Sequence, residues 1–386
     1  MASNYKKKLP NLKIMLTFKQ KLAKNYINSR GWRTRRKLLL IESDDWGAVR
    51  MPSRKTYEYF LSKNIAVDQS YFDKNDSLES AEDLEHLYEI LDGFRDINGN
   101  PAVITAFSVV ANPDFEKIEA NKRRQYHYEL ITETYKRNPH TEKSFALFRE
   151  GAKKRLLYPQ FHGREHLHTK RWIEAINSSS FKEQLAFKSR AFISSELETD
   201  KVQYPLGYMA AFNWSKKDET ELQKEIIADG LNQFHNLFGF HSLSFVASQS
   251  IWSDDINPTL AEHGVKLQVG QQLCPRGNNE TKLINKIWGT RNSAGQIHWR
   301  RNCTFEPSRN QDYDWANRCL QEIEIAFRWG KPAVINSHRV NYIGSIFPEN
   351  REKSLQKLKT LLTEVQKRWP EVEFVDTEKL GKIMVA

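Results

Sequence analysis

The order of apolar and polar positions divides the chain into short apolar runs and longer segments with a helical period. The runs are rich in β-branched and aromatic residues, as in "KLLLIES" (37–43), "PAVITAFSVV" (101–110) and "PAVINSH" (332–338). Segments such as "DWANRCLQEIEIAFRWG" (314–330) and "REKSLQKLKTLLTEVQKRW" (351–369) carry the helical pattern. Alternating strands and helices predict an α/β fold with a mainly parallel sheet, open or closed into a barrel. The other predicted strands are "YPQFHG" (158–163), "AFISSELE" (191–198), "GYMAAFNW" (207–214), "SLSFVASQ" (242–249), "VKLQVG" (265–270), "IHWRRNCTF" (297–305) and "VEFVDT" (372–377).

The same pattern predicts how the chain is organised. Residues 1–36 hold a disproportionate share of Lys and Arg and read as a basic N-terminal arm. Residues 37–386 contain all the predicted strands and are long enough to bury a substantial core, so we expect one α/β barrel domain there. The stretch around 112–157 is polar and helix-prone, which indicates a helical insertion between two strands.

Reactive side chains follow several of the apolar runs. Asp44 and Asp45 end the first run, His162 and His166 follow "YPQF", and His338 ends "PAVINSH". Active sites of parallel α/β folds lie at the carboxyl ends of the strands. We therefore predict that these residues share one site.

A divalent metal would explain this combination of residues. The i, i+4 spacing of His162 and His166 would place both imidazoles on one face of a helical turn. Of the two neighbouring carboxylates, one can bind the metal while the other stays free as a base, and the cation offsets their repulsion. Two His and one Asp leave coordination positions open, which is the catalytic pattern, with Zn²⁺ as the first expectation and other first-row metals as alternatives.

The Asp-Asp pair, the His-x-x-x-His motif and the late strand ending in His338 resemble the NodB-type polysaccharide deacetylases, carbohydrate esterase family four. The likeness extends roughly from Lys37 to Glu378 in the same chain order. It implies a distorted (β/α) barrel of about seven strands. It also implies a hydrolase that uses a metal to remove an acetyl group from an N- or O-acetylated sugar or polysaccharide precursor.

The resemblance assigns roles to individual positions. Asp44 matches the catalytic base, Asp45, His162 and His166 match the metal ligands, and His338 matches the general acid. Water activated by the metal and deprotonated by Asp44 would attack the acetyl carbonyl, and His338 would protonate the leaving amine or hydroxyl.

Two departures from the family pattern concern an arginine and an aspartate. The family's Arg-x-Pro motif, which orients the base, is missing from the corresponding run "FVASQSIWSDD" (245–255). Its charge could come from Arg300, Arg301 or Arg339, and the sequence does not choose among them. The "DYDW" run (312–315) echoes a later Asp-Trp motif of the family, but Asp314 equally fits a charge at a helix N-terminus.

Some residues beside the predicted site are candidates for substrate binding. The flat faces of Trp46, Trp252 and Tyr342 could stack on a sugar ring, with core packing as the alternative. Asp255 and Arg339 complete the predicted substrate-binding set. His168, two residues beyond His166, fits the start of a helix better than a ligand.

Three other functions remain open. "HGREH" fits the inverzincin motif of metalloproteases, with Glu165 as base, although Pro159 and Gly163 argue against the continuous helix it needs. A glycoside hydrolase of the same barrel superfamily would pair Asp44 with Asp254 or Asp255. The third alternative is a sugar-binding barrel without catalysis.

Charge and targeting signals narrow the partners and the location. The formal net charge is +11, and "RGWRTRRK" (30–37) ends the basic arm. The arm suits contact with an anionic membrane, while the sequence shows no nucleic-acid-binding motif. No run of eighteen apolar residues is present, and lysines interrupt the apolar N-terminal stretch, so we expect a cytoplasmic protein, peripheral at the inner membrane face. Cys274, Cys303 and Cys319 match no metal motif and are expected to be reduced.

Overall fold

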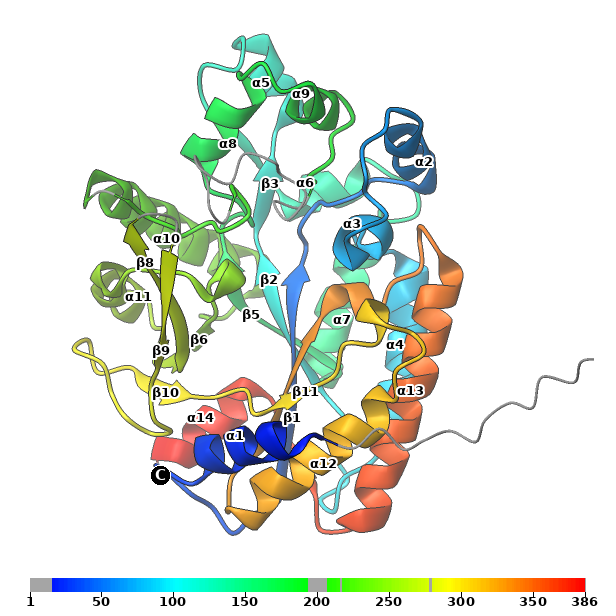
Figure 1. Cartoon of the computed structure of the whole chain (residues 1–386), viewed down its shortest axis with the longest axis vertical. Helices are drawn as coiled ribbons and strands as arrows, with labels where there is room; N and C mark the ends of the chain where they lie inside the picture. Colours follow the sequence, from blue (N-terminus) through cyan, green and yellow to red (C-terminus); the bar gives the residue numbers. More distant parts are fainter. Residues whose placement is uncertain (1–15, 194–206, 216, 278–279, 386) are drawn as a thin grey trace, which may run out of the picture.

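The computed structural model describes residues 16–193, 207–215, 217–277 and 280–385. Its centre is a curled sheet of parallel strands in the order β10-β7-β6-β5-β2-β1-β12-β11 (Figure 1). The ninth strand, β13 (Glu373–Phe374), pairs with the start of β1. The predicted α/β barrel class is confirmed, with eight strands around the curl where about seven were expected. The strands of the curl are β1 (Leu38–Trp46), β2 (Ile104–Val109), β5 (Leu157–Gly163), β6 (Ser244–Phe245), β7 (Leu267–Val269), β10 (Ile297–Trp299), β11 (Cys303–Thr304) and β12 (Ala333–His338).

Side chains alternate across β1 and thereby define an outer and an inner face. Leu39 and Ile41 belong to the cluster packed against helices α4 (Ala81–Asp92), α12 (Trp315–Arg328) and α13 (Pro348–Arg368). Leu38 and Leu40 belong to a second cluster inside the curl. Continuing this alternation places Glu42 and Asp44 on the inner face, where the strand reaches its carboxyl end.

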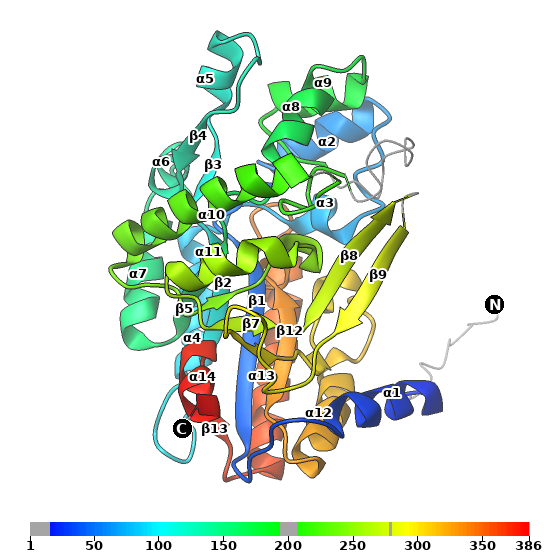
Figure 2. The same ribbon diagram turned by 90° about the vertical axis from the view of Figure 1, so that its left-hand side faces the viewer.

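The helices cover the outside of the sheet, as Figures 1 and 2 show. Helices α12 and α13 form where the sequence predicts them and pack on each other. The predicted insertion lies between β2 and β5 and contains a short hairpin as well as helices. It consists of β3 (Ala111–Pro113), α5 (Phe115–Ala120), β4 (Tyr128–Leu130), α6 (Ile131–Lys136) and α7 (Ser144–Lys154).

Further elements complete the fold around the sheet. The antiparallel hairpin of β8 and β9 was not predicted.

None of the helices in the described residues combines the length and the apolar character needed to cross a bilayer. The remaining elements are α2 (Arg54–Ser62), α3 (Tyr71–Asn75), α8 (Thr169–Ile176), α9 (Phe181–Lys188), α10 (Lys217–Phe238), η2 (Ser248–Ser250), η3 (Asp254–Ile256), α11 (Asn257–Glu262), β8 (Gln271–Gly277), β9 (Glu280–Asn285), η4 (Pro307–Arg309), η5 (Arg339–Asn341) and α14 (Thr377–Val385).

One predicted strand does not form, and another lies mostly outside the described residues. The run at 207–214 is a buried turn. Tyr208 and Met209 pack into an apolar cluster, and the Tyr208 carbonyl accepts a hydrogen bond from His168 N instead of from a neighbouring strand. Burial without strand pairing therefore explains its apolar composition. The run at 191–198 lies mostly outside the described residues, and its described part, 191–193, is not a strand.

Part of the predicted N-terminal arm belongs to the packed body. Helix α1 (Phe18–Asn28) contacts α12, and its Lys24 Nζ lies 3.1 Å from Glu322 Oε1. Residues 1–15 lie outside the described residues. Residues 16–36 are thus an element of the fold rather than a separate arm.

Candidate metal centre

The carboxyl end of β1 carries both aspartates in an irregular strand. Ser43 pairs with Ala106 and Trp46 with Ser108, so β1 has one more residue than β2 over this interval, which is a β-bulge. Asp45 occupies the bulge with a φ of 75°, a conformation that costs a non-glycine residue about 1–2 kcal/mol. Neighbouring strand residues normally point to opposite faces, and the bulge lets both carboxylates reach the same site.

His162 and His166 meet Asp45 from the end of β5. His162 is in the strand, and His166 lies on the bend that follows, so the two are not on one turn of helix as predicted. Gly163, with a φ of 136°, allows the sharp change of direction between them. The Nε2 atoms of His162 and His166 lie 3.4 and 2.9 Å from Asp45 Oδ1. One ligand atom from each of the three side chains, all buried, lies within 4.8 Å of the others.

The hydrogen bonds of this group fit a bound cation. His162 Nδ1 lies 2.7 Å from the carbonyl oxygen of Val246, which can only accept, so Nδ1 carries the proton. In the neutral ring, Nε2 is then a lone-pair donor that faces a carboxylate oxygen, and it has no hydrogen-bond partner. Burial lowers the pKa of His166 and so favours the neutral ring that a metal requires. The lone pair of His162 Nε2 and the carboxylate oxygen of Asp45 thus face each other in a buried site, where they repel. A divalent metal bound between them would remove this repulsion.

Asp44 faces an arginine instead of the histidines. Arg301 Nη1 and Nη2 lie 2.7 and 2.6 Å from the two oxygens of Asp44, a bidentate ion pair. Burial alone would raise the pKa of Asp44, but the Arg301 guanidinium holds it below its usual value. Arg301 also donates to Glu42 and Asn336. Asp44 is therefore a fixed carboxylate, the ionised form that a base requires.

Of the three candidate arginines, Arg301 is the one that binds Asp44. It lies in the short link between β10 and β11, the two edges of the sheet, and reaches inward from there. The other two candidates have different partners. Arg300 donates to Asn285 and the Lys286 carbonyl, whereas Arg339 is fully buried and pairs with Asp76 and Glu79.

His338 lies beside Asp44 in the register of β12 and β1. Its Nδ1 is 2.7 Å from Glu306 Oε1. Burial would lower the pKa of His338, but Glu306, Asp45 and Asp44 together raise it to about 10. His338 is thus protonated at neutral pH and can act as an acid.

Glu306 contacts His338 in the candidate site and was missed by the sequence analysis. It follows β11 directly, in "CTFEP" (303–307), so the signal used for the other site residues, a reactive side chain after an apolar run, was present.

Most of the predicted substrate-binding residues lie in the core instead. Trp46 and Tyr342 stack on each other and are buried, and Trp252 packs edge-on against Phe245. Arg339 is fixed by its two ion pairs, as described above. Asp255 is exposed in η3. The apolar area of the tryptophans is used in packing, so in this structure none of them offers a free face to a sugar.

Two further predictions concern helix starts. His168 caps α8 and accepts a hydrogen bond from Arg171 N, as predicted. Asp314 caps α12 by accepting from Asn317 N, which supports its interpretation as a helix-terminal charge.

The helical arrangement of the inverzincin motif does not form among the described residues. The inverzincin motif needs a helix through His162 and His166, but the segment is a strand followed by a bend, and Glu165 is ion-paired with Arg164. Of the two carboxylates predicted to partner Asp44 in a glycoside hydrolase, Asp254 accepts hydrogen bonds from Gln272 and Asn257, and Asp255 is exposed.

Comparison of the sequence with models of known protein families finds no match, and comparison with curated proteins finds none either. Solved structures with a similar chain path include a protein from Mycobacterium smegmatis described as a polysaccharide deacetylase, with 11% identity, a TM-score of 0.40, and coverage of 92% of this chain and 93% of that one. A Parabacteroides distasonis protein described as a glycoside hydrolase/deacetylase has 9% identity and a TM-score of 0.46, covering 91% and 72%. The allantoinase PuuE has 9% identity and a TM-score of 0.42, covering 91% of each chain. Likeness at this level says nothing about activity, so the function proposed below rests on the geometry of the site.

Proposed function

We propose that the protein is a hydrolase that uses a divalent metal to remove an acetyl group from an N- or O-acetylated sugar or glycan precursor. The observation that carries the proposal is the arrangement of three kinds of group around one point. The buried Asp45, His162 and His166 could hold a metal, Asp44 beside them is an ionised carboxylate, and His338 is a protonated imidazole.

The roles of the residues follow from their protonation states. A Zn²⁺ or similar ion held by Asp45, His162 and His166 would acidify water and polarise the acetyl carbonyl. Asp44 takes one proton from the attacking water, whose oxygen forms a bond to the carbonyl carbon. His338 gives its proton to the nitrogen or oxygen of the sugar as the bond to the acetyl carbon breaks. The products are acetate and the free amine or hydroxyl.

Arg301 and Glu306 position the two proton-transfer groups. Arg301 binds both oxygens of Asp44 and lowers the pKa of that carboxyl group. Asp44 is therefore a weak base, which suits a water molecule that a bound metal would acidify. Glu306 fixes the ring of His338 through Nδ1, leaving Nε2 to face the leaving group.

The first experiment measures bound metal by elemental analysis in the purified wild type, in Asp45→Ala and in His162→Ala/His166→Ala. We expect about one equivalent in the wild type and loss in both variants, since each removes a ligand. The control His86→Ala/His241→Ala removes two exposed histidines and should keep the metal. Retention of metal by both triad variants would contradict the proposed centre.

The second measurement is acetate release from N-acetylated and O-acetylated sugars. Asp44→Asn should keep the metal and lose roughly 10²- to 10⁴-fold in rate, the usual contribution of a positioned base. New reducing ends without acetate would identify a glycoside hydrolase instead.

A further inference from the structure

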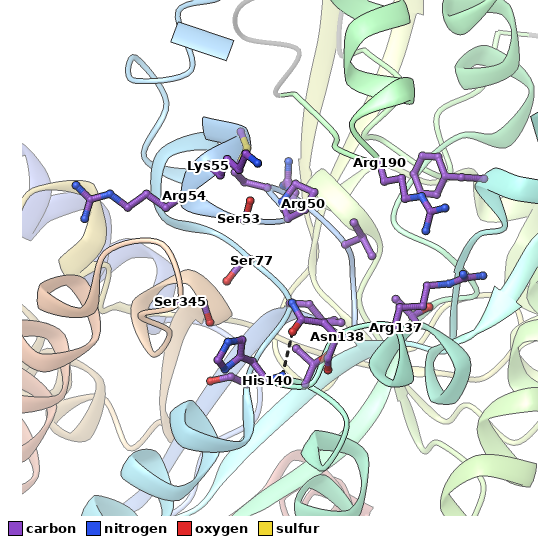
Figure 3. A pocket seen from close by; sticks show the side chains of 18 of the residues that line it. Arg50, Ser53, Arg54, Lys55, Ser77, Arg137, Asn138, His140, Arg190 and Ser345 are labelled. Atoms are coloured by element: carbon purple, nitrogen blue, oxygen red, sulfur yellow. Dashed lines mark hydrogen bonds between the residues drawn. The ribbon is translucent and has the colours of Figure 1, made fainter. Parts of the chain in front are cut away.

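A cavity of about 630 Å³ opens beside the metal centre and is lined by apolar walls and several cations (Figure 3). Figure 3 shows the side chains of Arg50, Ser53, Lys55 and Ser77 around the same space. The volume suits a ligand of small-molecule size. The apolar walls come from Val49, Met51, Pro52, Leu78, Pro113, Phe115 and Pro348, and the cations are Arg50, Arg54, Lys55, Arg137 and Arg190.

Ser77 is a buried donor in this cavity with no partner, and Arg50 Nε reaches only a carboxylate oxygen of Asp76, 3.6 Å away. Ser77 is 2% exposed and Arg50 is 6% exposed, yet neither Ser77 Oγ nor Arg50 Nε makes a hydrogen bond. A buried polar atom without a partner costs about 1–3 kcal/mol, so such atoms point to a missing ligand. Ser77 Oγ therefore has no acceptor, and the contact of Arg50 Nε with Asp76 is longer than a hydrogen bond.

The carboxylates around the cavity do not supply that acceptor. Glu82 pairs with Arg351, Glu129 with Arg137, and Glu116 with both Arg137 and Arg190. Their charges are therefore already matched. Lys55 has no ion-pair partner within the described part of the chain.

Helix α2 begins at this cavity with the wrong charges for its own stability. Ser53 is its N-cap, and Arg54 and Lys55 occupy the first two helical positions, with no acidic residue in the first turn. Arg54 is paired with Glu58 one turn further on, at 3.0 Å. The positive end of a helix dipole favours acidic residues, so the remaining cation, Lys55, is unfavourable there unless an anion lies nearby.

We infer that the cavity binds a phosphate-bearing part of the substrate. A phosphate group accepts hydrogen bonds from several directions and carries up to two negative charges. This matches the unpartnered Ser77 hydroxyl, the Arg50 guanidinium, Lys55 and a helix N-terminus. The apolar walls would hold the group attached to the phosphate. Arg50 joins the two sites, because its guanidinium lines the cavity and lies 3.9 Å from Asp45 Oδ2.

This inference rests on the proposed function and narrows it to phosphorylated acetyl-sugars. The test that separates the two is calorimetric titration with inorganic pyrophosphate. It is performed on the wild type and on His162→Ala/His166→Ala, because binding in the variant cannot depend on the metal centre. We expect saturable binding to both that weakens as salt is raised.

Variants in the cavity show where the probe binds. Lys55→Ala should weaken pyrophosphate binding about tenfold, and Ser77→Ala several-fold, as expected for charge-assisted and neutral hydrogen bonds. Lys63→Ala removes the same charge from the other end of α2 and should change nothing. Equal affinity in wild type and Lys55→Ala, or no binding at low salt, would overturn the inference while leaving the metal result untouched.

The source of the phosphate is decided by competition. An N-acetylhexosamine 1-phosphate should displace pyrophosphate and should be a better acetate donor than the unphosphorylated sugar. Displacement by phosphatidate vesicles but not by the sugar phosphate would assign the site to a lipid headgroup and overturn the substrate assignment.

A separate observation concerns the outer face of α1. Phe18, Leu22 and Tyr26 recur every four residues and are 78%, 54% and 68% exposed. They form one apolar stripe, while the opposite face of the helix packs on α12. The exposed cations Lys19 and Arg30 flank the stripe, and Arg33 and Arg35 follow the helix.

We propose that this face binds an anionic membrane surface. An apolar stripe flanked by Lys and Arg is the pattern of helices that lie in the bilayer interface. In both Figure 1 and Figure 2, α1 and α2 lie far apart along the vertical axis. A membrane on α1 would therefore leave the cavity beside α2 open to the aqueous side.

Sedimentation of the full chain with vesicles tests this surface. Binding to phosphatidylcholine/phosphatidylglycerol vesicles should exceed binding to pure phosphatidylcholine, and Leu22→Ser/Tyr26→Ser should lower the partition coefficient at least about tenfold. Phe181→Ser/Leu283→Ser removes equally exposed apolar side chains elsewhere and is the control. Equal partition of both variants would overturn the proposal. It would also be overturned if the wild type did not bind vesicles but formed a dimer that Leu22→Ser/Tyr26→Ser dissociates.

Discussion

At the scale of single residues, Asp44 and Asp45 differ in what each one contacts. Asp44 is held on both oxygens by Arg301, and Asp45 faces two imidazoles. The sequence could predict that both carboxylates end an apolar strand and that a cation should compensate them. It could not predict the bulge, nor which arginine binds Asp44, because 257 residues separate the two partners.

The protonation of His338 leads to a prediction on pH. The pKa of His338 is raised to about 10 in the folded protein, whereas in the unfolded chain it is about 6.5. The pairing of His338 with Glu306 therefore stabilises the fold fully below a pH of about 6.5, and this stabilisation is lost as the pH rises through about 10. In Glu306→Gln the anionic partner is missing, although Asp44 and Asp45 remain nearby. We expect the alkaline limb of the rate profile to move down by at least about one pH unit, and stability above neutral pH to vary less with pH than in the wild type.

Rate profiles and thermal melts from pH 6 to 10.5 check this prediction. Glu371→Gln removes an exposed carboxylate and serves as the control. An unchanged alkaline limb in Glu306→Gln would mean that His338 is not the acid.

At the scale of elements, α1 supports the segment that carries Arg301. Lys24 Nζ donates to the carbonyl oxygen of Asn302 at 2.7 Å, and Asn302 Nδ2 donates to Asn28 Oδ1 at the same distance. Charge composition alone made this helix look like an independent arm. Its role could not be predicted because it depends on a contact between residues 274 positions apart.

Asn28→Ala should therefore affect both stability and activity. Removing the buried Asn28 amide leaves groups on Asn302 and α1 without a partner and should cost about 1–3 kcal/mol in the free energy of unfolding. Because Asn302 neighbours Arg301, we also expect kcat to fall more than KM rises. Denaturant unfolding and steady-state kinetics measure the two effects, with the exposed Asn98→Ala as control. A loss of stability with unchanged kcat would limit α1 to a structural role.

At the scale of the whole molecule, alternating strands and helices were enough to predict the parallel curled sheet and the end at which Asp44, Asp45 and the histidines meet. Short strands were harder to predict. The apolar run at 207–214 is a buried turn, and the β8–β9 hairpin lacks a strong apolar pattern. Residues from β1 and β5 converge at the metal centre because parallel strands bring their carboxyl ends to one edge of the sheet.

This convergence predicts that metal binding stabilises the entire fold. A metal that binds only when β1 and β5 are paired stabilises the native state by about 2.7 kcal/mol at a free concentration one hundred times Kd. For a chain of this length, the increase in Tm should be about 3 °C. Calorimetry with added Zn²⁺ and with chelator measures it in the wild type and in His162→Ala/His166→Ala, where the shift should vanish. The exposed-histidine variant His86→Ala/His241→Ala should retain the shift, because it leaves Asp45, His162 and His166 unchanged. An equal shift in the wild type and the triad variant would place the metal elsewhere, and Asp45, His162 and His166 would then be a hydrogen-bonded cluster in the core.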